Sequence, residues 1–151
     1  MKKNKIRIAH FFVIALTVLI PIIGVFNPNL WFDEAYSVGL AKQDWNTLFV
    51  AAIDDVHPVL YYVLLKIFTS IPGNSLVTFR IFSVIPIIAL SIMSYTHISK
   101  KFGEKTGLAF AFILLFLPVT FHYGAQIRMY SWAMLFVAIT AYYAYAAVME
   151  E

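Results

Sequence analysis

Residues 30–45 read LWFDEAYSVGLAKQDW and place an acidic pair, Asp33-Glu34, just after the first apolar run of membrane length. A carboxylate at the centre of a membrane helix costs about 2.5–3.5 kcal/mol. The pair therefore lies at the water edge or in a polar pocket beside the membrane. A second acidic pair, Asp54-Asp55, follows in the same segment. The stretch between the first two long apolar runs thus carries most of the polar chemistry of this chain.

The composition is that of an integral membrane protein. Of the 151 residues, 62% are hydrophobic and 13% are charged, whereas a soluble domain has about 45–50% apolar and about 25% charged residues. Cysteine is absent, which excludes disulfides, zinc–thiolate sites and thiol nucleophiles. The net charge of +3 does not indicate a nucleic-acid partner, because the positive charges follow membrane sidedness. The partner that the composition predicts is the lipid bilayer.

The apolar runs predict an all-α, polytopic membrane fold with about four transmembrane helices. A span takes about 20 helical residues, and the runs that satisfy this are residues 8–26, 76–99, 106–123 and 129–148. A fifth run, residues 58–71, is shorter, contains Lys66 and stops at Pro72-Gly73. Runs of this length are more often interfacial, re-entrant or buried than spanning.

The positive charges indicate which side is which. Seven of the eleven Lys and Arg residues fall in two clusters, at residues 2–7 and 100–105, and such clusters mark the cytoplasmic side. If both are cytoplasmic, an even number of crossings separates them, so residues 58–71 are expected on the outer membrane surface. The outer side then carries the loop 27–75 and the hairpin 122–128.

The outer loop is expected to form two juxtamembrane surface helices. Within residues 34–53, apolar side chains recur at three- and four-residue steps, which predicts an amphipathic helix. Asp33 is well placed to cap this helix, a structural role that competes with any chemical one. Pro58 opens the second helix, residues 58–71, where its missing N–H costs least. The residue before a proline is held extended, so His57 projects from a defined turn.

Two arginines and a tyrosine belong to the same outer side. Arg80 lies about one turn inside the second span, within snorkelling reach of the surface. Arg128 and Tyr130 follow the third span. A guanidinium at such a place can hold a phosphate by charge-assisted hydrogen bonds, although for Arg80 a plain interface anchor is the simpler interpretation.

Four segments carry a family resemblance in their order and spacing: LWFDEAYSVGLAKQDW, DDVHPVLYYVLLKIF, FRIFSVI and HYGAQIRMYSW. Together they resemble the N-terminal part of the bacterial family 39-like membrane glycosyltransferases, which share the GT-C fold with protein O-mannosyltransferases and aminoarabinose transferases. The resemblance implies a partial GT-C fold. It also implies inverting transfer of a sugar from a polyprenyl-phosphate donor to a lipid, glycan or protein acceptor, at the outer face of the cytoplasmic membrane.

The resemblance also implies roles for particular residues. The aspartate thought to act as the catalytic base of the family maps onto Asp33, and Glu34 would orient the acceptor or tune Asp33. His57 occupies the position of a basic residue that contacts the donor phosphate, and it carries a full charge only at mildly acidic pH. Arg128, Tyr130 and Arg80 complete the expected set of donor-phosphate and substrate-binding residues.

Two departures and one open question accompany the resemblance. Gln126 stands where a glutamate is common, so no acid role is expected there. A divalent cation is left open, since hard cations take carboxylates and only some members of the fold use one; its candidate ligands are Asp33, Asp54, Asp55 and His57. Relatives continue for several hundred residues, so the sequence is expected to be an N-terminal portion. The alternative is a non-catalytic membrane scaffold or a truncated remnant of such an enzyme.

Overall fold

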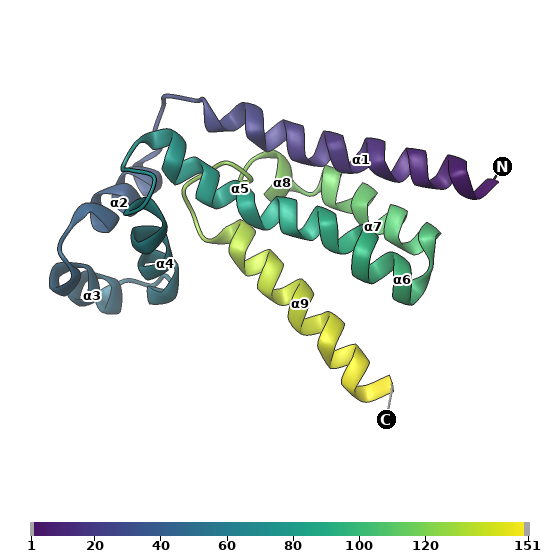
Figure 1. Cartoon of the computed structure of the whole chain (residues 1–151). Coiled ribbons are helices and arrows are strands. Elements are labelled where there is room, and N and C mark those ends of the chain that lie inside the picture. Colours follow the sequence, from purple (N-terminus) through teal and green to yellow (C-terminus); the bar gives the residue numbers. More distant parts are fainter. Residues whose placement is uncertain (1, 150–151) are drawn as a thin grey trace.

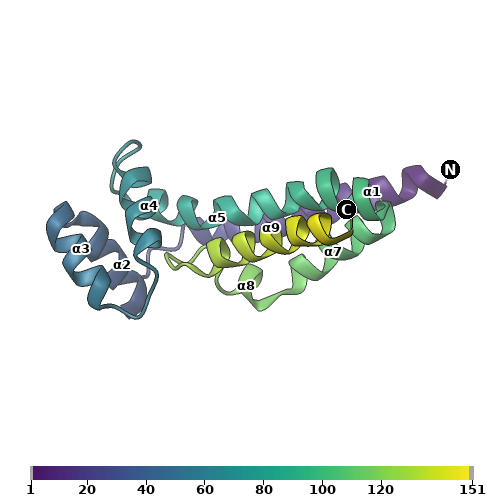
Figure 2. The same ribbon diagram turned by 90° about the horizontal axis from the view of Figure 1, so that it is seen from below.

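The computed structural model describes residues 2–149, with the backbone alone for residues 2 and 3. Within that range every element is helical: α1 (Lys2–Val25), α2 (Phe32–Lys42), α3 (Trp45–Asp54), α4 (Val59–Thr69), α5 (Leu76–Met93), the π-helical turn η1 (Ser94–Ile98), α6 (Ser99–Phe102), α7 (Glu104–Phe116), α8 (Pro118–Phe121) and α9 (Tyr130–Met149). Helices α1, α5, α7 and α9 form an elongated bundle, and α2, α3 and α4 form a lobe at one end of it (Figure 1). Figure 2 shows the lobe lying beyond the end of the bundle where α5 begins.

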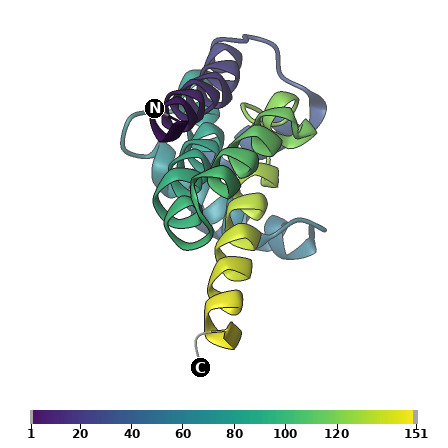
Figure 3. The same ribbon diagram turned by 90° about the vertical axis from the view of Figure 1, so that its right-hand side faces the viewer.

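Three helical stretches among the described residues are long and apolar enough to cross a membrane: Asn4–Val25, Leu76–Phe102 and Tyr130–Met149. The chain is therefore a multi-pass, all-helical membrane protein, as its composition predicts. The second stretch combines α5, η1 and α6 and is the central helix, with 61% of its apolar window buried. Only 6% of the corresponding window of α9 is buried, and α9 diverges from the rest of the bundle (Figure 3).

The predicted span 106–123 is not one continuous helix. Helix α7 ends at Phe116 because Leu117 precedes Pro118 and takes an extended conformation, with φ −65° and ψ 135°. The clash between a proline ring and the preceding residue disfavours the helical conformation there. After this break the short helix α8 follows. The chain nevertheless returns through α7 and α8 from the end at α6 to the end near the lobe (Figure 1).

The predicted surface helix 34–53 is two helices, joined at an extended link. Helix α2 ends at Lys42 and α3 begins at Trp45. The Asp44 carboxylate caps α3 by accepting hydrogen bonds from the backbone N–H and the hydroxyl of Thr47, at 3.0 and 2.6 Å. The same bonds hold the pKa of Asp44 below its ordinary value. Such local side-chain bonds compete with the helix ladder, so the chain turns at Asp44.

The second predicted surface helix, residues 58–71, corresponds to α4, which packs in the lobe. Its Tyr62 and Leu65 are fully buried with Leu48 of α3 in one apolar cluster. The cluster continues into the bundle through Phe79 of α5 and into the loop before α9 through Ile127. The lobe therefore shares a core with the bundle, and this core positions the polar residues above it.

The other end of the bundle gathers the basic residues. The N-terminus and α6 lie together at that end (Figure 1), and Arg7 Nε donates to Glu104 Oε1 at 2.8 Å. This ion pair joins the first basic cluster to the turn that carries the second. Two basic clusters at one end of the bundle agree with an even number of crossings between them.

Gly107 of α7 lies too close to the central helix to carry a side chain. A Cβ at this position would lie 1.9 Å from Ser99 Oγ and 2.6 Å from the Ser94 carbonyl oxygen. Alanine ordinarily favours a helix over glycine by about 1 kcal/mol, but overpacking costs about 1–3 kcal/mol. We predict that Gly107→Ala lowers the melting temperature of the purified protein in detergent.

A matched glycine provides the control. A Cβ on Gly39, which lies inside α2, would meet nothing within 4 Å. Gly39→Ala is therefore expected to leave the melting temperature unchanged or to raise it, because only the helix preference changes. Equal melting temperatures for the two variants would contradict the close packing of α7 on η1.

Candidate active site at the junction of lobe and bundle

A buried ion pair joins the lobe to the bundle. The side chains of Glu34 in α2 and Arg80 in α5 are 1% and 3% exposed, and Arg80 Nη1 donates to Glu34 Oε1 at 2.9 Å. Arg80 also donates to the carbonyl oxygens of Ala125 and Asn29, at 3.0 and 2.6 Å. One guanidinium thus ties α5 to the loop after α1, to α2 and to the loop 122–129.

Glu34 has further partners within the protein. Its carboxylate accepts the backbone N–H of Trp31 and that of Ile127, each at 3.0 Å. A buried carboxylate with this many donors is a structural anchor. The geometry therefore does not favour the predicted roles of Glu34 in orienting an acceptor and of Arg80 in binding a phosphate, because each is engaged by the other.

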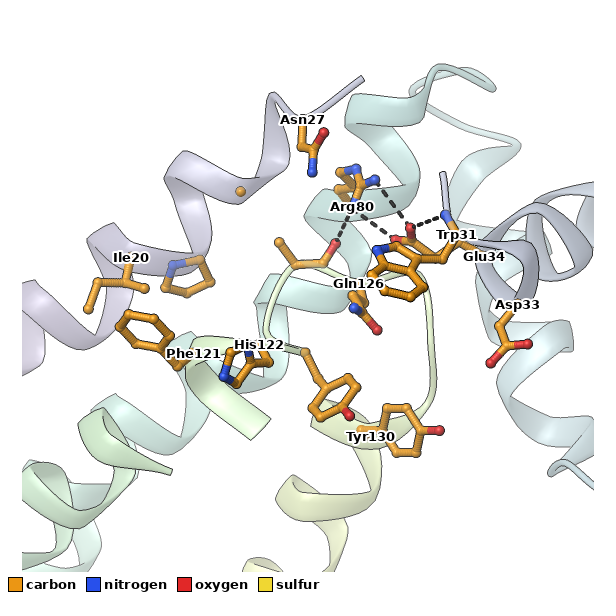
Figure 4. Close-up of a pocket in the computed structure, with 14 residues that line it drawn as sticks. Ile20, Asn27, Trp31, Asp33, Glu34, Arg80, Phe121, His122, Gln126 and Tyr130 are labelled. Carbon is orange, nitrogen blue, oxygen red and sulfur yellow. Dashed lines mark hydrogen bonds and ion pairs between the residues drawn. The ribbon is translucent and has the colours of Figure 1, made fainter. Parts of the chain in front are cut away.

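Asp33, the neighbouring acid, lies on a different face of α2. It does not cap α2, because the helix begins one residue earlier, at Phe32. Its side chain is 63% exposed and lines two cavities, of about 760 Å³ and about 500 Å³. Figure 4 shows the Asp33 carboxylate pointing away from the Glu34–Arg80 pair. The predicted capping role is therefore wrong, and the carboxylate stands at the boundary between the two cavities.

Arg128 lines the smaller cavity beside Asp33 and forms an ion pair with it. The Arg128 side chain is 4% exposed, and its Nη2 lies 4.0 Å from Asp33 Oδ2. Nη1 donates to the Asp33 carbonyl oxygen at 3.3 Å and to Ser37 Oγ at 3.5 Å. Its buried Nε atom has no hydrogen-bond partner, as is also true of Arg80 Nε. Arg128 lines the smaller cavity, and a buried cation beside a cavity favours an anion there, because an incompletely neutralised buried charge is costly.

His57 contacts Arg128 through an acceptor nitrogen. His57 Nε2 and Arg128 Nη2 are 2.6 Å apart, and a guanidinium can only donate. The ring proton that this contact leaves is assigned to Nδ1, which donates to Asp55 at 3.0 Å. In this arrangement His57 orients Arg128. The prediction that His57 itself presents positive charge to a phosphate is not favoured by this contact.

Tyr62 extends the chain of hydrogen bonds. Its hydroxyl donates to Asp55 Oδ2 at 2.7 Å. Burial alone would raise the pKa of Asp55, but the hydrogen bonds from Tyr62 and His57 outweigh burial and hold that pKa below its ordinary value. Burial, and then the hydrogen bond to Asp55, raises the pKa of Tyr62. At neutral pH Asp55 is therefore ionised and Tyr62 is protonated. The Asp55 carboxylate can then accept the hydrogen bonds of both Tyr62 and His57.

The remaining predicted residues divide between the two cavities. Tyr130 lines the larger cavity, where its ring centroid lies 5.0 Å from that of Tyr123, and it is not among the residues that line the smaller cavity with Arg128. Asp54, Asp55 and His57 line the smaller cavity with Asp33. Within residues 2–149, no group of three acidic or histidine side chains is placed to hold a metal ion.

Ser37 and Tyr62 belong to the site but were not among the residues predicted from the sequence. Ser37 lies one helical turn after Asp33, a spacing that places both residues on one face of α2. Nothing in the sequence distinguishes Tyr62 from the adjacent Tyr61. Their roles depend on contacts between elements that are distant along the chain.

Comparison with known families defines the class of protein. A family described as dolichyl-phosphate-mannose-protein mannosyltransferase matches residues 56–151, which is more than half of the chain. The chain belongs to this family of membrane glycosyltransferases. The match includes His57, Arg80 and Arg128 and begins after Asp33. Neither the curated proteins nor the solved structures include a match to the chain.

Substitutions of the buried Glu34 and of the exposed Asp33 are expected to differ in their effect on stability. Removing one partner of a buried ion pair costs about 3–5 kcal/mol, because the other charge is left unmatched. We predict that Glu34→Gln strongly lowers the melting temperature in detergent. Asp33→Asn, one residue away, is a surface change and is expected to stay within about 0.5 kcal/mol of the parent. Similar losses in both variants would rule out Glu34 as the anchor of the lobe.

Proposed function

We propose that this chain carries the catalytic base and the donor-phosphate contact of an inverting glycosyltransferase that uses a polyprenyl-phosphate sugar. One observation carries the proposal: the exposed carboxylate of Asp33 and the buried guanidinium of Arg128 form an ion pair, with Oδ2 and Nη2 4.0 Å apart, and both line one cavity. Membership of the family supports sugar transfer. The geometry supports a division of roles between the two residues.

Arg128 is the contact proposed for the donor phosphate. As the bond to the sugar breaks, negative charge grows on the phosphate, and a preorganised cation in a water-poor site stabilises that charge strongly. Arg128 lines the smaller cavity, so its guanidinium is within reach of an anion bound there. His57 holds the guanidinium in place through Nε2, so it is a positioning residue in this scheme.

Asp33 is the proposed general base. It would take the proton of an acceptor hydroxyl while the hydroxyl oxygen attacks the anomeric carbon on the face opposite the phosphate, which inverts that carbon. A base in this reaction must touch the acceptor and lie beside the donor. Asp33 satisfies both requirements, since it lines the cavity of Arg128 and the larger cavity next to it.

Sugar transfer provides the direct test of Asp33. We predict that Asp33→Asn lowers transfer from a labelled polyprenyl-phosphate sugar, in membranes that contain the protein, by about 10²–10⁴-fold, the usual contribution of a general base. Asp44→Asn is the matched control, because asparagine caps a helix as well as aspartate does, and it should retain full transfer. Unchanged transfer by Asp33→Asn, with normal insertion, would remove the proposed role.

We further propose that the lobe lies outside the cytoplasmic membrane and the N-terminus inside. The basic clusters at the far end of the bundle support this orientation, and the Arg7–Glu104 pair links them. The chain has no cysteine, so single cysteines can be introduced as labels.

Labelling from outside the cell tests this orientation. We predict that Asn46→Cys in the lobe reacts with a membrane-impermeant maleimide on intact cells. Lys105→Cys, at the other end of the bundle, should react only after the membrane is permeabilised. Reaction of both positions from the same side would contradict the arrangement of spans.

A further inference from the structure

The larger cavity reaches from the lobe into the membrane-length part of α1. Ile20, Pro21 and Gly24 line it from α1, and Phe121 lines it from α8. Ile20 precedes the last residue of α1 by five positions, which at 1.5 Å per residue is about 7.5 Å along the helix. The apolar end of the cavity therefore lies alongside the last turns of a helix that is long and apolar enough to cross a membrane.

The lining changes from apolar to polar along the cavity. Figure 4 shows Ile20 and Phe121 at one end, with His122 beside Phe121, and Asp33 at the other end, with Gln126 between them. Three aromatic side chains with polar tips, Trp31, Tyr123 and Tyr130, accompany the polar part of the lining. Such groups suit a ligand that is half wet and half apolar. The apolar end is on the side away from the proposed base.

Two side chains of the lining are also widely exposed. Phe121 is 62% exposed and Trp31 is 71% exposed. Phe121 is the last residue of α8, whereas Trp31 stands two residues before Asp33 at the lobe. Each end of the cavity thus carries a lining side chain that the rest of the protein leaves largely exposed.

The walls of the cavity are held by close contacts between α1 and the loop 122–129. A Cβ on Gly24 would lie 2.9 Å from Ala125 Cβ. A Cβ on Gly124 would lie 2.5 Å from the Thr120 carbonyl oxygen and 3.0 Å from Pro21 Cβ. Because α1 and the loop already touch here, the loop cannot move further toward α1 to fill the space.

We propose that the acceptor is itself a membrane amphiphile, a hydroxyl-bearing lipid or lipid-linked glycan, whose polar head reaches Asp33 while its apolar part leaves past Phe121 and Ile20 into the bilayer. This inference rests on the proposed function and adds the class of acceptor. A peptide backbone at the apolar end would leave N–H and C=O groups without partners, each costing several kcal/mol. An acyl or prenyl chain has no such groups.

Photo-cross-linking identifies the occupant without requiring turnover. A photoreactive benzoylphenylalanine replaces Phe121 in the full chain, and the adduct formed in native membranes is identified by mass. The same replacement at Ile23, which is 74% exposed on α1 and is not part of the lining, is the control. We expect a hydroxyl-bearing lipid or glycolipid at position 121 and bulk phospholipid at position 23. A peptide adduct, the polyprenyl donor, the same phospholipid at both positions or no adduct at 121 would each overturn the inference.

A substitution that fills part of the larger cavity tests the same inference in the transfer reaction. Ile20→Trp narrows the apolar end, and Ile23→Trp adds the same ring on the lipid-facing side of α1. For Ile20→Trp we expect about tenfold less label in the organic-phase product, which corresponds to a loss of about 1.4 kcal/mol in acceptor binding. For Ile23→Trp we expect no change. Label recovered in protein, with no effect of Ile20→Trp, would overturn the amphiphilic acceptor while leaving the base role intact. Full transfer by Asp33→Asn would instead overturn the proposed function.

Discussion

The ion pair between Glu34 and Arg80 is the interaction on which the rest of the site depends. Both side chains are buried, and an isolated charge at that depth is strongly unfavourable. The pair is tolerated because backbone groups complete its hydrogen bonds, with N–H donors on Glu34 and C=O acceptors on Arg80. Those groups come from two connections of the chain, the one between α1 and α2 and the one between α8 and α9, so the pair determines how the lobe sits on the bundle.

Because Glu34 is buried in this pair, the two adjacent acids, Asp33 and Glu34, have different surroundings. Successive residues of an α-helix point about 100° apart, so a buried Glu34 leaves Asp33 on a different face. Asp33 then stands opposite Arg128, whose position is supported from behind by His57, Asp55 and Tyr62. One acid stabilises the junction, and the other faces the two cavities that the junction creates.

Much of the fold could be predicted from local sequence. The long apolar runs at 8–26, 76–99 and 129–148 correspond to membrane-length helices, because hydrophobic length is a property of the chain alone. The single helix predicted over 34–53 and the continuous helix over 106–123 were wrong. In each case a local interaction interrupts the helix that the apolar pattern predicts. Asp44 caps a new helix in the first case, and the extended residue Leu117 before Pro118 ends the helix in the second.

The sequence by itself determined that this is a membrane protein, which residues are polar enough to form a site, and that the family resemblance runs through them. Hydropathy, charge and motif order are properties of neighbouring residues. Only the tertiary structure decided that Glu34 and Arg80 are anchors, that His57 is an acceptor toward Arg128, and that Asp33 stands between two cavities. Those outcomes depend on burial and on hydrogen bonds between residues far apart in the chain, which no local pattern specifies.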